Sequence, residues 1–189
     1  AAVKMADGRV MVIAGKSRGG ASAWKPSAIE DTAIYDPATG EWTDAAVLST
    51  VRETPTGHLL QDGRVIVIGG SALRQLPLTS VEVYDAAADT WTEVASMATE
   101  RWRHGSVMFE DGRIMVVAGE KADLVLVAEA EIYDPVADTW SAAGTLAEAR
   151  ALHTVTLLSD GRVLAVGGGK RESPYLKTAE IYDPATGEW

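Results

Sequence analysis

The chain has 189 residues, a net charge of −10 and 47% hydrophobic residues, a composition that predicts a packed domain and argues against nucleic acid as a partner. No apolar run reaches the ~18 residues that a membrane span needs, so no membrane insertion is expected. Cysteine is absent, which excludes disulfides, thiolate metal sites and thiol nucleophiles.

A pattern of Tyr-Asp, with a tryptophan seven residues after the tyrosine, recurs four times at intervals of 49 residues. A fixed period near fifty residues indicates one supersecondary unit copied along the chain. The series consists of Tyr35, Trp42, Tyr84, Trp91, Tyr133, Trp140, Tyr182 and Trp189. We interpret residues 1–189 as one domain with repeats at approximately 1–49, 50–98, 99–147 and 148–189.

Each repeat predicts four short strands, most clearly in the third copy. Residues 101–109 predict the first strand, and an Asp-Gly dipeptide then suits a tight hairpin turn. Residues 113–119 form a continuous apolar run, which is typical of a strand covered on both faces. Residues 129–133 predict the third strand, and the fourth begins at Trp140. Four antiparallel strands per repeat indicate a β-propeller blade, and no segment has the period of a helix.

Two further positions recur in each repeat. The second strand ends in glycine each time, at Gly15, Gly70, Gly119 and Gly168. The turn before the tryptophan holds Gly40, Asp89, Asp138 and Gly187, residue types that accept a left-handed backbone, so positive φ is expected there. Residues present in every copy are expected to be structural, and the Tyr and Trp rings can bury apolar area between neighbouring blades.

The motifs Arg-x-x-His, Asp-Gly-Arg-Val-x-x-x-Gly-Gly and Glu-x-Tyr-Asp-Pro, with the spaced tryptophan, resemble kelch repeats over nearly the entire chain. This resemblance implies an all-β fold, a β-propeller of four-stranded antiparallel blades whose first strands line a central channel. Repeat 2 departs from the pattern at Ala86, where proline is usual, and at Pro55, where repeats 3 and 4 have histidine. These departures affect local turns and leave the predicted fold unchanged.

Both ends of the chain truncate a repeat. The arginine that precedes each Asp-Gly by ten residues would fall ahead of Ala1 in repeat 1, and the chain stops at Trp189, where an outer strand should begin. We therefore expect four blades of a larger ring of six to eight blades, closed by missing blades. The rivals are a homodimer that closes an eight-bladed ring and a strained four-bladed ring.

Aromatic residues that break the repeat are candidates for recognition. Three lie outside the series, namely Trp24, Trp102 and Tyr175. In a kelch-like blade the loops between strands two and three share one face with the links between blades, and we call this the loop face. We expect the three aromatic side chains to gather on the loop face and to contact a ligand.

Basic residues are also concentrated there. Eight of the 17 lysines and arginines fall in these loops and four more begin inner strands, while acidic turns occupy the opposite face, which we call the turn face. We expect a neutral-to-basic loop face that steers anionic partners towards it. The basic candidates for ligand binding are Arg74, Arg101, Arg103, Lys121 and Arg171. For the repeated arginines Arg52, Arg101 and Arg150, scaffold ion pairs are the alternative.

No catalytic constellation is marked in the sequence. His104 and His153 share one position in consecutive repeats, which favours a role in the repeat over metal ligation, and His58 is out of phase with them. Galactose-oxidase-like enzymes also use a kelch propeller, but their copper lies beside a Cys-linked tyrosine that no cysteine can supply here. We expect no catalytic residue, no metal and no cofactor.

Two functions remain open. The favoured one is a non-catalytic module that presents its loop face to a protein or peptide partner, for which an acidic peptide is a candidate because some kelch adaptors hold such peptides with arginines at this location. The alternative is a carbohydrate-binding or carbohydrate-active propeller in which the unpaired aromatic rings stack on sugars. The Asp-Pro-Ala-Thr-Gly-Glu-Trp form of the repeat resembles bacterial extracellular proteins, which favours an extracellular or cell-surface location.

Overall fold

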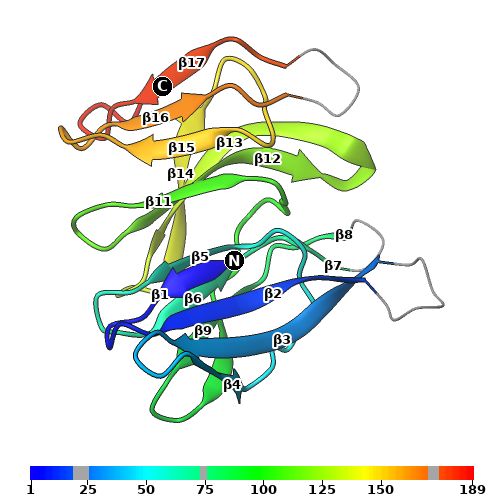
Figure 1. Ribbon diagram of the computed structural model, residues 1–189. Coiled ribbons are helices and arrows are strands. Elements are labelled where there is room, and N and C mark those ends of the chain that lie inside the picture. The colour runs from blue at the N-terminus through cyan, green and yellow to red at the C-terminus, as the bar shows by residue number, and fades with distance from the viewer. Residues whose placement is uncertain (19–25, 73–75, 170–174) are drawn as a thin grey trace. The chain divides into compact units, whose positions relative to one another are not determined.

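The computed structural model describes residues 1–18, 26–72, 76–169 and 175–189, with the backbone alone for residues 16–18 and 26–29. The chain divides into two compact units, Ala1–Val94 and Ala95–Trp189. Each unit contains two antiparallel blades (Figure 1). No helix in the described part of the chain is long and apolar enough to cross a membrane.

The first unit holds blades 1 and 2, coloured from blue to green in Figure 1. Blade 1 is a sheet in the order β1-β2-β3-β4, and blade 2 has the order β5-β6-β9-β10 with a small β7-β8 hairpin beside it. The strands are β1 Ala2–Lys4, β2 Val10–Arg18, β3 Pro26–Asp36, β4 Glu41–Ala45, β5 Thr56–Leu59, β6 Val65–Ile68, β7 Ser71–Ala72, β8 Leu76–Pro77, β9 Val81–Asp85 and β10 Thr90–Val94.

The second unit holds blades 3 and 4. Blade 3 is a sheet in the order β11-β12-β13-β14, and blade 4 has the three strands β15-β16-β17. A short 3₁₀ turn, η1, joins β12 to β13 on the loop face. The elements are β11 Gly105–Met108, β12 Ile114–Lys121, η1 Ala122–Leu124, β13 Val125–Asp134, β14 Thr139–Thr145, β15 Thr154–Leu157, β16 Val163–Val166 and β17 Ala179–Tyr182. The predicted all-β fold of propeller blades is therefore confirmed.

Blade 3 shows why the sequence makes these hairpins. The Asp-Gly turn closes β11 onto β12, with Gly112 at a φ of 89° and the Asp111 carboxylate accepting the N–H of Arg113 at 3.0 Å. The strand β12 is buried from Ile114 to Glu120, because it is the second strand of its sheet and is covered on both faces. The strand β13 then pairs with β12 through a bulge between Val117 and Gly119.

The first strands of blades 2, 3 and 4 are shorter than the sequence predicts. We expected it to begin at the repeated arginine, at residue 101 in repeat 3, but β11 begins at Gly105. The residue two positions after the repeated arginine has positive φ in three repeats, at Thr54 (50°), Arg103 (52°) and Leu152 (57°). A left-handed residue cannot continue an extended strand, so the segment bends there before the strand starts.

The interior of each unit is formed where two blades meet. In the first unit, Met11, Ile13 and Ile34 of blade 1 pack in one cluster with Val65 and Val67 of blade 2. In the second, Met115, Val117 and Ile132 of blade 3 cluster with Val163 and Ala165 of blade 4. A single sheet cannot bury its own apolar face, so each blade packs against the other blade of its unit. This packing fixes the strand ends, and with them the loops.

Candidate functional site

The repeated arginines lie in the interior; they are Arg52, Arg101 and Arg150. Arg101 Nη2 donates to Glu131 Oε1 at 2.5 Å, and its Nη1 donates to the carbonyl oxygens of Ala118 at 2.9 Å and Glu129 at 2.8 Å. Burial lowers the pKa of the Arg101 guanidinium, and the charge of Glu131 opposes this shift. Arg101 therefore offers no surface to a ligand, which corrects the prediction that placed it among the binding residues.

The same ion pair recurs in blades 2 and 4. Arg52 Nη2 lies 2.8 Å from Glu82 Oε1, and Arg150 Nη2 lies 2.6 Å from Glu180 Oε1. The carboxylates also accept backbone N–H groups of the link that enters the blade, as Glu180 does from Ala147 at 2.7 Å. The alternative interpretation of these arginines as scaffold ion pairs agrees with this geometry.

Trp102 and Arg103 form one cluster with Glu120. The N–H and C=O of Trp102 pair with the backbone of Glu120 at 3.0 and 2.9 Å, and Trp102 is only 3% exposed. The guanidinium carbon of Arg103 lies 3.8 Å from the centroid of the Trp102 ring, and Arg103 Nη1 lies 3.0 Å from Glu120 Oε2. The arginine thus caps the ring by a cation–π contact. Trp102 is covered from solvent, which corrects the prediction that it contacts a ligand. Part of the Arg103 side chain stays at the surface.

The Tyr and Trp of each repeat stack with ring centroids between 5.0 and 5.5 Å apart. Trp91 Nε1 donates to the carbonyl oxygen of Ala46 at 2.9 Å, and Trp140 Nε1 donates to that of Ala95 at 2.8 Å. Both carbonyls belong to the link that enters the blade from the preceding repeat. The rings therefore attach one repeat to the next.

Tyr175 and Lys121 are the predicted binding residues that the structure places at the surface of the loop face, and Tyr175 is 78% exposed. The predicted candidates Trp24, Arg74 and Arg171 lie outside the described residues.

Sequence reasoning missed three exposed apolar side chains on the loop face, which are Leu76, Val125 and Leu152. Leu152 is 58% exposed. The sequence contains a signal for it, because the equivalent residues of repeats 2 and 3 are Thr54 and Arg103, so the position varies between repeats.

Backbone hydrogen bonds link Arg103 to Leu152 directly, and join the segment of Leu152 to that of Tyr175 through neighbouring residues. The N–H of Leu152 donates to the carbonyl oxygen of Arg103 at 3.0 Å. Its neighbour Ala151 forms a bridge with Gly169, and Leu176, next to Tyr175, donates its N–H to Gly168 at 2.8 Å. We call Arg103, Leu152 and Tyr175 the loop patch. It combines a guanidinium with two exposed side chains of apolar character, which suits contact with another molecule and carries no acid–base pair.

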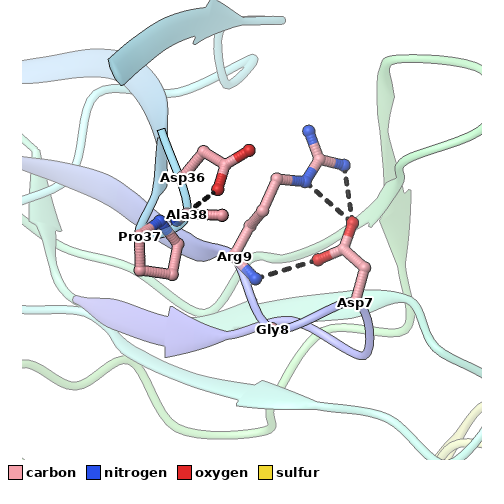
Figure 2. Close-up of a pocket in the computed structure, with 6 residues that line it drawn as sticks. All are labelled: Asp7, Gly8, Arg9, Asp36, Pro37 and Ala38. Carbon is pink, nitrogen blue, oxygen red and sulfur yellow. Dashed lines mark hydrogen bonds and ion pairs between the residues drawn. The ribbon is translucent and has the colours of Figure 1, made fainter. Parts of the chain in front are cut away.

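The turn face of blade 1 has a shallow hollow of about 370 Å³, shown in Figure 2. Its lining is Asp7, Gly8, Arg9, Asp36, Pro37 and Ala38. Arg9 Nη2 lies 2.7 Å from Asp7 Oδ2, and Asp36 Oδ1 accepts the N–H of Ala38 at 2.8 Å. The bond from the Arg9 N–H holds the pKa of Asp7 below its ordinary value. Both carboxylates are engaged within their own turns, so the hollow shows no group poised for catalysis.

The Asp-Arg pairs of the turn face also alter the expected charge distribution. The same pair recurs at 2.7 Å between Asp62 and Arg64 and between Asp160 and Arg162. Each of these arginines pairs with one turn acid, and the interior arginines contribute no surface charge to the loop face. The polarity of the two faces stays a prediction, because Lys25, Arg74, Lys170 and Arg171 lie outside the described residues.

His104 and His153 are buried, and His58 is half-buried. Burial lowers the pKa of His58 to about 4, and burial with the charge of Arg150 lowers that of His153 to about 4. His153 lies close to Gly105, whose ideal Cβ position is 3.1 Å from His153 Nε2. In the described part of the chain, no three His, Asp or Glu side chains form a group that could hold a metal ion.

Two segments match the kelch motif model, residues 54–98 and 150–189, which correspond to blades 2 and 4. No curated protein matches the chain. Blades 1 and 3 carry the same Tyr-Trp pairs and the same strand order as the matched segments. The repeated blades and the matched motifs together make this chain a member of the kelch-repeat β-propeller family.

Proposed function

We propose that the chain is a non-catalytic binding module whose loop face holds a protein or peptide partner. Kelch propellers generally act as protein-interaction modules, which supports the class of partner. The observation that carries the proposal is the loop patch, where Leu152 is 58% and Tyr175 is 78% exposed on segments that are joined through backbone bonds of their neighbours. Exposed apolar side chains beside polar groups are the anchors that protein interfaces use.

The partner that fits the loop patch has an apolar anchor residue. The guanidinium of Arg103 already pairs with Glu120 at 3.0 Å, so it offers a partner little uncompensated charge. Lys121 and Lys177 are exposed basic residues on the same face and supply the attraction for an acidic flank. The proposal is therefore a short peptide with an apolar residue next to one or more carboxylates.

The test is a selection from a random peptide library displayed on phage, with the full chain as bait. Selected peptides are then measured against the double variant Leu152→Ser/Tyr175→Ser. Loss of two anchors should weaken binding about 30-fold or more. Val136→Ser is the matched control, because Val136 is 96% exposed but lies on the turn face. Peptides that bind both variants as tightly as the unaltered chain would refute the proposed site.

The acidic flank is tested separately by Arg74→Ala, Lys121→Ala and Arg171→Ala in one variant. Removing these charges should weaken the binding of acidic peptides and make it less sensitive to salt, because the attraction that salt screens is lost. A neutral peptide with the same apolar anchor should bind equally to both proteins. Equal loss for both peptides would show that charge plays no part.

A glycan partner is the second candidate, favoured by the exposed ring of Tyr175, which can stack on a sugar. A glycan array probed with the full chain tests it. Tyr175→Ala should then abolish glycan binding while the triple Arg74, Lys121 and Arg171 variant retains it. A glycan that binds the Tyr175→Ala protein unchanged would exclude stacking at this position.

A further inference from the structure

The outer strands of the blades differ in how well they protect their free edges. In the described parts of blades 1, 2 and 3, the fourth strand pairs on one side only, so its other edge carries N–H and C=O groups with no strand beside them. Charged side chains on such an edge discourage pairing with another chain. The strand β4 carries Glu41 and Asp44, and β10 carries Glu93. The strand β14 has neither a charged residue nor a proline, so it lacks this protection.

The regular part of β14 is its first four residues. The register with β13 runs without interruption from Thr139 to Ala142 and then shifts at a bulge, where Gly144 has a φ of 74°. Two of the four side chains, those of Ser141 and Ala142, are small and exposed. The backbone of this stretch is therefore accessible from the free edge.

Two residues of this stretch direct their backbone groups outwards. In an antiparallel pair, alternate residues bond to the neighbouring strand, and the residues between them face away from it. In blade 4 the N–H of Asp183 donates to the carbonyl oxygen of Glu188 at 2.9 Å, and the equivalent pair of blade 3 contains Thr139. Because Thr139 bonds inwards, the residues that face the free edge are Trp140 and Ala142.

Carboxylates flank β14 at both ends. Asp138 directly precedes Thr139 and is exposed, and the exposed Glu129 lies opposite Thr145 at the other end of the strand. A second copy of this chain, with its own net charge of −10, would bring like charges to this edge, which is unfavourable. A strand with basic residues at its ends would instead meet opposite charges.

We propose that the free edge of β14 binds an extended segment of a partner protein, which adds a fifth strand to blade 3 over Thr139–Ala142. The segment has β-branched residues at its centre and a lysine or arginine at each end. In this mode of recognition the main-chain hydrogen bonds supply affinity, and the end charges supply preference. The site lies on the outer edge of the sheet and is separate from the loop patch, so it goes beyond the function proposed above.

The test uses the fluorescein-labelled peptide Lys-Val-Thr-Val-Thr-Lys as a probe, with binding to the full chain measured by fluorescence anisotropy. Ala142→Pro removes an outward N–H at a free edge, a position where strands tolerate proline. It should raise the dissociation constant about tenfold or more, because one main-chain hydrogen bond contributes about that factor. Ala142→Thr is the matched control, which keeps the N–H, adds a β-branched side chain and should bind at least as tightly.

A second measurement serves if Ala142→Pro does not fold. The same peptide with N-methyl groups on its four central residues cannot donate main-chain hydrogen bonds, so it should not bind the unaltered chain. The Leu152→Ser/Tyr175→Ser variant should bind the unmethylated peptide unchanged, which separates this edge from the loop patch. Glu-Val-Thr-Val-Thr-Glu should bind more weakly than the lysine peptide at low salt, and the difference should shrink at about 1 M salt.

No binding of the lysine peptide, equal binding by Ala142→Pro and Ala142→Thr, or equal binding of the methylated peptide would overturn the proposed strand pairing. Equal binding of the lysine and glutamate peptides would overturn the preference for basic ends. A dimer of the full chain that Ala142→Pro abolishes, seen by light scattering, would show that a second copy occupies the edge and would overturn the choice of partner.

Discussion

The guanidinium of Arg101 lies in the interior of blade 3 and donates hydrogen bonds to one carboxylate and two carbonyl oxygens. Removing it leaves the buried Glu131 without its counter-charge, and breaking a buried pair from one side is costly. We predict that Arg101→Leu lowers the free energy of unfolding by about 3–5 kcal/mol, measured by urea denaturation. Arg113→Leu removes an exposed pair with Asp111 and should cost at most about 1 kcal/mol. Equal losses of stability in the two variants would contradict the conclusion that the buried Arg101–Glu131 pair is the more important one.

The buried histidines make the fold sensitive to mild acid. His153 has a pKa of about 4 in the folded chain against about 6.5 when unfolded, so the unfolded state binds more protons between these values. Stability should be complete above pH 6.5 and fall as the pH drops towards 4, by about 3 kcal/mol for His153.

The check is the slope of the unfolding free energy between pH 5 and 7. His153→Gln should reduce this slope, while the contribution of His58, whose pKa is also about 4, persists. A variant with the slope of the unaltered chain would show that His153 titrates normally when folded.

At the scale of the strand, the glycine that ends the second strand makes room for the link. A Cβ at Gly168 would lie 2.5 Å from the carbonyl oxygen of Ala151 and 2.8 Å from the Cβ of His153. Gly161 in the Asp-Gly turn has nearly the same φ, 84° against 82°, but nothing within 4 Å of its Cβ position. The two glycines share backbone strain and differ in crowding.

We predict that Gly161→Ala costs about 1–2 kcal/mol, the cost of a left-handed alanine, and that Gly168→Ala costs about 1–3 kcal/mol more. Chemical denaturation of the two variants side by side measures the difference. Similar costs would mean that the link can move away from the strand end.

The elements differ in how far the sequence predicts them. Hairpins were predictable because Asp-Gly and the second-strand glycines have strong local preferences and recur at one spacing. The late start of the first strand was not, because the residue with positive φ is Thr54, Arg103 or Leu152 in successive repeats, and none of these types signals a left-handed backbone.

The same limit applies to the site. The exposure of Tyr175 agrees with its position in a loop outside the repeat, but the burial of Trp102 depends on its pairing with Glu120 across the link. That contact joins segments 18 residues apart. The same bridge recurs in repeats 2 and 4, but the residue types at its two positions differ in each copy, so the sequence does not reveal it. Leu152 was overlooked because an apolar residue beside a buried strand is usually core, and only the comparison of repeats marks it as different.

At the scale of the whole molecule, positions shared by the repeats hold blades and links together, while Arg103, Leu152 and Tyr175, which differ between repeats, reach the surface of the loop face. Among the described residues, the interior arginines are buried and the arginines of the Asp-Gly turns pair with their own aspartates. Recognition should therefore depend more on the apolar members of the loop patch than on net charge.

Hydrogen–deuterium exchange of the full chain, with and without a peptide selected by phage display, tests this division most directly. The account predicts slower amide exchange on peptide binding in residues 120–127, 150–153 and 175–178 of the loop face. Exchange in the turns at 110–113 and 134–138 should not change. Protection centred on those turns, with the loop segments unaffected, would contradict the assignment of recognition to the loop face.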